Sequence, residues 1–87
     1  MNARKRVAWN LRRIRVLNDL SQERLAVDAD IDRTYVGRLE RGLENPTIGI
    51  LDRLATALSV DVSVFLLLPK PGEKPPKPLR SGRRPFS

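Results

Sequence analysis

The chain has 87 residues and carries 17 Lys and Arg against 10 Asp and Glu, a net charge of +7. This length supplies one small core, and the charge favours an anionic partner such as nucleic acid or an acidic membrane surface. The absence of Cys and His excludes disulfides, thiolate metal sites and imidazole catalysis. No apolar run approaches the roughly 20 residues of a transmembrane helix. We therefore expect a soluble cytoplasmic protein without enzyme activity or cofactor.

The first predicted helix spans about residues 3–18. It contains no Gly or Pro, and its apolar residues recur at helical spacing: Val7, Leu11, Ile14 and Leu17. Ser21 can accept the free amide protons at the start of a second helix, 22–29. After a tight connection of two residues, Asp32 can cap a third helix, 33–41, and Gly42 can end it in the left-handed conformation.

Two further helices complete the predicted core. Thr47 can cap a fourth helix, whose apolar residues are spaced for burial: Ile48, Leu51, Leu54, Ala55 and Leu58. Asp61 can cap a fifth helix, about 62–67, which Pro69 ends. Because no segment has the pattern of a strand, the sequence predicts an all-α domain of five helices over residues 1–68.

Residues 69–87 differ from the rest of the chain in composition. They hold six of the seven Pro residues, and six Lys or Arg against one Glu. Such a segment does not bury a core and favours extended conformations. We expect a disordered basic tail that attracts DNA without selecting its sequence.

The third helix has two distinct faces when its residues are placed about 100° apart. Val36 and Leu39 define a buried side. The opposite side is basic and polar, with a glycine at its centre: Arg33, Thr34, Gly37, Arg38 and Arg41. Arg forks can donate to guanine O6 and N7, and a glycine lets a helix backbone approach a partner surface. A solvated helix surface is the plain alternative.

Four sequence motifs, taken together, are similar to those of a known family. They are Leu20-Ser-Gln-Glu-Arg-Leu-Ala, Ile31-Asp-Arg-Thr-Tyr-Val-Gly-Arg-Leu-Glu-Arg-Gly42, Asn45-Pro-Thr-Ile and Leu51-Asp-Arg-Leu-Ala-Thr-Ala-Leu58. In this order and spacing they resemble the Cro/repressor-type helix-turn-helix family, and the start of the third helix resembles restriction-modification controller proteins. The resemblance covers about residues 5–67. It implies a phage-repressor-like fold whose helix-turn-helix, 21–41, reads duplex DNA.

The resemblance also implies roles for individual residues. The base-facing positions of the recognition helix match Arg33, Thr34, Gly37 and Arg38. Phosphate-contacting positions match Gln22 and Asn45, and we expect Arg41 to contact phosphate as well. The plain alternatives are a generic helix-start residue for Gln22 and a turn residue before Pro46 for Asn45. Tyr35 lies beside the buried side and belongs either to the core edge or to a phosphate contact. Arg15 and Glu40 match an ion pair between the first and third helices, and Asp30 stands where the family usually has Gly.

The fifth helix carries more apolar residues than one buried stripe needs: Val64, Phe65, Leu66 and Leu67. They either close the core or form the surface of a homodimer, and dimerisation through C-terminal helices is common in the family. We expect a homodimer on an inverted-repeat operator, acting as a repressor or autoregulator. One alternative is an antitoxin or other interaction module whose tail binds a partner protein. Another is a basic protein that binds RNA or a membrane surface.

Overall fold

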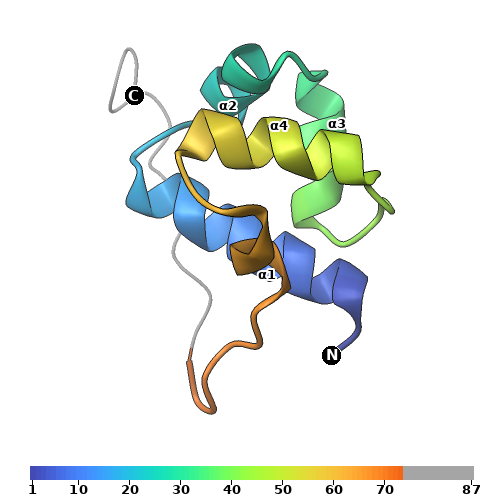
Figure 1. Cartoon of the computed structure of the whole chain (residues 1–87), viewed down its shortest axis with the longest axis vertical. Coiled ribbons are helices and arrows are strands. Elements are labelled where there is room, and N and C mark those ends of the chain that lie inside the picture. Colours follow the sequence, from blue (N-terminus) through green and yellow to red (C-terminus); the bar gives the residue numbers. More distant parts are fainter. Residues whose placement is uncertain (74–87) are drawn as a thin grey trace.

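A computed structural model describes residues 1–73. Within that range it contains four α-helices, one 3-10 helix and no strand, which confirms the predicted all-α fold. The elements in chain order are α1 (Ala3–Leu17), α2 (Gln22–Ala29), α3 (Arg33–Glu40), α4 (Ile48–Leu58) and η1 (Val62–Leu66) (Figure 1). Residues 74–87, most of the predicted tail, lie outside the described residues. No described helix is long and apolar enough to cross a bilayer.

Each helix begins behind a polar side chain that accepts a hydrogen bond from a backbone N–H in its first turn. Ser21 Oγ accepts from Arg24 N at 2.9 Å, and Asp32 Oδ2 accepts from Thr34 N at 2.9 Å. The caps of the remaining elements are Asn2, Thr47 and Asp61. Because these caps satisfy amide protons without a partner inside the helix, α2, α3 and α4 start where the sequence predicts. At its other end α1 stops at Leu17, one residue before the prediction.

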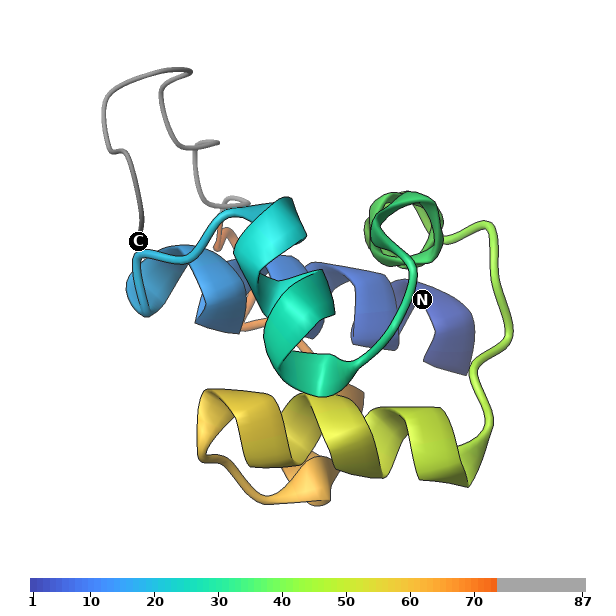
Figure 2. The same cartoon turned by 90° about the horizontal axis from the view of Figure 1, so that it is seen from above.

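The helices enclose one core made from their apolar faces. Its fully buried apolar side chains come from all five elements: Leu11, Leu25, Val36, Leu39, Leu54 and Phe65. α3 packs on α1 and α2, α4 packs on α2, and η1 packs on α1 and α4. Figure 2 shows α3 nearly along its axis, at one side of the domain. One face of α3 therefore contributes to the core, and the other is turned outward.

A tight turn joins α2 to α3. Asp30 adopts the left-handed conformation, with φ 57° and ψ 51°, which residues other than Gly enter at some cost. Ile31 N donates to Ala26 O at 2.9 Å, and the Ile31 side chain packs against the core. Asp30 thus takes the conformation expected of a Gly at this position, and Ile31 attaches the turn to α2 and to the core.

The C-terminal end of the domain differs from the prediction in two respects. The fifth element is a 3-10 helix of five residues that ends at Leu66, and it is not an α-helix. Phe65, for which the sequence left a place in the core or on a dimer surface open, is fully buried and closes the core, so it is not part of an exposed dimer surface. Asn10 Nδ2 donates to Phe65 O at 3.1 Å and to Leu67 O at 2.7 Å. These bonds hold η1 against α1 with the Phe65 ring in the core, while Leu66 and Leu67 stay exposed.

Candidate nucleic-acid interface

The two faces of α3 lie as the helical periodicity predicts. Val36 and Leu39 are buried, with 0% and 1% of their surface exposed. The outward face carries the basic and polar side chains, all exposed: Arg33, Thr34, Arg38 and, directly after the helix, Arg41. Gly37 is half-buried among them. The candidate interface is therefore one helix face that combines three guanidinium groups with a hydroxyl and a central gap.

An ion pair anchors α3 to α1. Arg15 Nε donates to Glu40 Oε2 at 2.5 Å and Arg15 Nη2 donates to Glu40 Oε1 at 3.0 Å. Both side chains are nearly inaccessible, at 6% and 4% exposure. Arg15 Nη1 also donates to Leu20 O at 2.7 Å, in the connection between α1 and α2. The pair therefore makes the expected contact, and through Leu20 it joins the first three helices.

The same carboxylate also fixes Gln22 at the start of α2. Gln22 Nε2 donates to Glu40 Oε1 at 3.0 Å, which fixes the amide against the end of α3. A Cβ atom built on Gly37 would lie 3.6 Å from Gln22 Oε1. Gln22 is thus held beside the gap at Gly37, and its amide nitrogen has a second N–H besides the one bonded to Glu40.

The end of α3 returns the chain toward the outward face. Gly42, at φ 74°, occupies the left-handed position. Gly42 N donates to Leu39 O and Leu43 N donates to Arg38 O, both at 3.0 Å, which is the Schellman pattern of a helix C-terminus. α3 ends at Glu40, and the predicted last residue, Arg41, is its C-cap. Glu44, the residue after Leu43, lies close to Arg38 as a result of this turn.

Glu44 is a polar contact that the sequence analysis missed. Arg38 Nε donates to Glu44 Oε2 at 2.6 Å. The signal for this contact in the sequence was an acidic residue two positions after Gly42, where the helix ends.

Tyr35 lies near Glu44 and is affected by its charge. Burial, and secondly the charge of Glu44, raise the pKa of the Tyr35 phenol above its ordinary value, so this hydroxyl remains a donor at neutral pH. Tyr35 is half-buried and packs against the core, which agrees with its place at the core edge.

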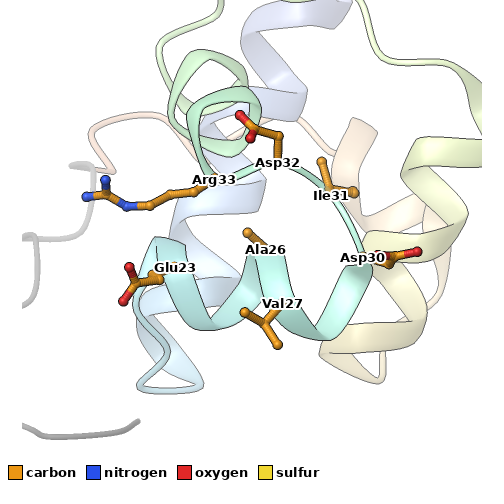
Figure 3. A pocket seen from close by; sticks show the side chains of 7 residues that line it. All are labelled: Glu23, Ala26, Val27, Asp30, Ile31, Asp32 and Arg33. Atoms are coloured by element: carbon orange, nitrogen blue, oxygen red, sulfur yellow. The ribbon is translucent and has the colours of Figure 1, made fainter.

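An open hollow lies on the outer side of α2 and the turn (Figure 3). Its charged lining residues are Glu23, Asp30, Asp32 and Arg33. The three carboxylates make this side of the domain unfavourable for phosphate, whereas the side chain of Arg33 points away from the turn in Figure 3. Within residues 1–73, no group of three or more His, Cys, Asp or Glu residues could hold a metal ion. The hollow therefore does not extend the candidate DNA-binding surface beyond the α3 face.

The chain is similar to known proteins in both sequence and structure. Residues 11–65 match the helix-turn-helix family. The chain belongs to the helix-turn-helix family. Control protein C.SmaI of Serratia marcescens is 41% identical over 66 residues, covering 76% of this chain and 79% of the relative.

Solved structures show the same helix-turn-helix fold. A hypothetical transcription factor from Neisseria superposes with a TM-score of 0.76 and 37% identity, covering 80% of each chain. The restriction-modification controller protein C.AhdI from Aeromonas hydrophila gives a TM-score of 0.69 at 37% identity, covering 71% of this chain and 94% of the controller. The family match at 11–65 contains α2, α3 and the loop to α4, so the candidate interface lies inside the family domain.

Proposed function

We propose that this DNA-binding transcriptional regulator reads a specific duplex sequence by inserting α3 into the major groove. The observation that carries the proposal is the outward face of α3, with exposed Arg33, Thr34 and Arg38 around Gly37. The helix is held rigidly, because Glu40 at its end bonds to Arg15 of α1 and Gln22 of α2. A rigid helix with forked donors suits direct reading of base edges.

The residues of this face divide into two roles. Arg33 and Arg38 donate to base edges, the Thr34 hydroxyl or methyl contacts a base, and Gly37 lets the α3 backbone come close. Phosphate contacts come from the edges of the interface: Gln22, Tyr35, Arg41 and Asn45. Gln22 has a spare amide proton, Tyr35 keeps its phenolic proton, and Arg41 and Asn45 are exposed. These contacts fix the position of α3 without selecting a sequence.

We further propose a homodimer on an inverted-repeat site. One recognition helix reads only a few base pairs, so two copies are needed to discriminate against competing genomic sites. Leu66 and Leu67 are 45% and 54% exposed, and half-buried Val64 lies beside them. A two-fold axis at this surface would set the two α3 helices about 34 Å apart, one DNA turn, as inverted half-sites require.

A repressor or autoregulator acting in the cytoplasm is the role that this site supports best, since occupying an operator requires no cofactor and no second activity. The antitoxin alternative places the function in the segment after residue 68. The relatives named above are controllers and a transcription factor, which favours the regulator. The tail's non-specific attraction to DNA concerns residues that lie mainly outside the described part of the chain.

Substitutions at two positions distinguish a residue that contacts bases from one that contacts phosphates. The reference duplex is first selected from a random pool, and we expect it to have inverted symmetry. Arg38→Ala should cost about 1–3 kcal/mol on that duplex and relax the preference at one base pair. Gln22→Ala should weaken specific and random duplexes alike, because phosphates are present in both. Fluorescence anisotropy titrations at fixed salt measure both quantities; equal losses on both duplexes for Arg38→Ala would remove its base-reading role.

Gly37→Ala should change stability and DNA binding in opposite directions. The added methyl has ordinary contact room in the free protein, 3.6 Å from Gln22 Oε1, and Ala favours a helix by about 1 kcal/mol over Gly. The melting temperature should rise by about 4–8 °C. Binding to the selected duplex should weaken by about 1–3 kcal/mol, a typical cost of adding a methyl group to a packed contact.

Gly49→Ala is the matched control for the Gly37 substitution. Its new methyl would lie 3.7 Å from Thr47 Oγ1, in the first turn of α4, and thus has the same room without adding a group to α3. It should leave DNA binding unchanged. Unchanged DNA binding in Gly37→Ala as well would show that the gap on α3 is not used for close approach.

A further inference from the structure

Glu44 stands in an unexpected place for a DNA-binding surface. Its carboxylate lies against Arg38 on the outward face of α3, with Arg38 Nε 2.6 Å from Glu44 Oε2. A negative charge beside a phosphate backbone is unfavourable. The pair is also partly exposed, at 44% for Arg38 and 28% for Glu44, and exposed pairs of this kind stabilise a fold by about 1 kcal/mol or less. Folding stability therefore gives little reason for a carboxylate here.

The geometry of the pair suggests a different role. The bond uses Nε, on one edge of the guanidinium group, and leaves the two terminal nitrogens, with four N–H bonds, free to donate. Those two nitrogens form the fork that matches guanine O6 and N7. A partner at Nε restricts rotation of the guanidinium plane, so the fork is oriented before DNA arrives. Such preorganisation reduces the entropy lost on binding.

The position of Glu44 is itself fixed. The Schellman bonds from Gly42 and Leu43 close the end of α3 one residue earlier, and Pro46 follows two residues later. The charge of Glu44 also acts on Tyr35, one turn of α3 before Arg38. The carboxylate thus lies against the outward face at the end of α3, bonded to Arg38.

We propose that Glu44 is a specificity-determining positioning residue that orients Arg38 for one guanine and lowers affinity for random duplex DNA by repelling phosphate. This inference rests on the proposed base-reading role of Arg38. It gives Glu44 two measurable effects of opposite sign, a gain in preference at one base pair and a loss in non-specific affinity. A merely structural loop residue would produce neither.

The test measures the full chain and its Glu44→Ala and Glu44→Gln variants, each with Arg38 and with Arg38→Ala. Each protein is titrated at fixed salt against the selected duplex, single-base-pair variants of it and a random duplex. Glu44→Ala should lose about 3–10-fold of the preference at one base pair, part of the value of a bidentate arginine contact. Its affinity for random duplex should rise. Glu44→Gln, which keeps a hydrogen-bond acceptor, should lose less preference.

Two controls make these results specific to the pair. Asp28→Ala breaks another exposed ion pair, Arg24 to Asp28, on α2, and it should leave the base preference unchanged. In the Arg38→Ala background, Glu44→Ala should cause no further loss at the affected base pair, since the oriented group is gone. Melting temperatures verify that every variant is folded.

The outcomes separate this inference from the proposed function. If Arg38→Ala relaxes one base pair and Glu44→Ala leaves that preference intact, the role of Glu44 is wrong and the proposed reading by α3 stands. Tighter binding of Glu44→Ala to all duplexes with unchanged preference would identify an inhibitory contact, which also overturns the positioning role. If Arg38→Ala itself relaxes no base pair, the base-reading assignment of Arg38 fails, and the role of Glu44 fails with it.

Discussion

Replacing Glu40 by Ala should lower the free energy of unfolding by about 3–5 kcal/mol, the usual cost of removing one partner from a buried ion pair. Arg15 is 5% exposed, and without Glu40 it keeps only Leu20 O among its three hydrogen-bonded acceptor atoms. A nearly inaccessible guanidinium group would then remain charged without a counterion. Urea denaturation at neutral pH, followed by circular dichroism, measures the change.

Two comparisons test this explanation. Glu23→Ala removes an exposed carboxylate from the first turn of α2 and should change the free energy of unfolding by no more than about 1 kcal/mol, the scale of a surface helix-end charge. Replacing Arg15 by Met and Glu40 by Leu together should recover much of the lost stability, because both charges leave the interior. A midpoint for Glu40→Ala equal to that of the Glu23 control would mean that the pair contributes nothing to folding.

The helix-turn-helix itself could be predicted from the sequence because its signals are local. Ser21 and Asp32 bond to amides two or three residues away, so the starts of α2 and α3 depend on no distant contact. The alternation of Val36 and Leu39 with polar residues likewise defines the two faces of α3. The ion pair of Arg15 with Glu40 spans 25 residues and was expected only through the family resemblance.

The remaining features depend on tertiary packing. The apolar run at Phe65 to Leu67 indicates a surplus of hydrophobic surface but not which side chain turns inward. The inward side is the one that fits the core, where the Phe65 ring packs, and Asn10 holds this arrangement through bonds to the Phe65 and Leu67 carbonyls, 55 and 57 residues away. The bond from Arg38 to Glu44 also depends on how the chain turns at Gly42. Sequence periodicity describes faces of helices, and it contains no information on contacts formed across such a turn.

The last prediction separates the monomer core from the proposed dimer surface by changing neighbouring residues. Phe65→Ala should lower the free energy of unfolding by about 3–5 kcal/mol, through lost burial and the cavity left behind, because the Phe65 ring is fully buried. Leu67→Ser changes a side chain that is 54% exposed. It should leave the unfolding of the isolated monomer within about 0.5 kcal/mol of the original chain.

Dimer formation, unlike the stability of the monomer, should depend on Leu67. Sedimentation over a range of protein concentrations should show a dimer for the original chain and a monomer for Leu67→Ser, because the serine removes apolar area from the proposed contact. Leu17→Ser is the matched control, since Leu17 is 71% exposed at the end of α1, outside the proposed surface. Dimers in all three proteins would exclude Leu67 from the interface, and monomers in all three, both free and on the selected duplex, would exclude the homodimer itself.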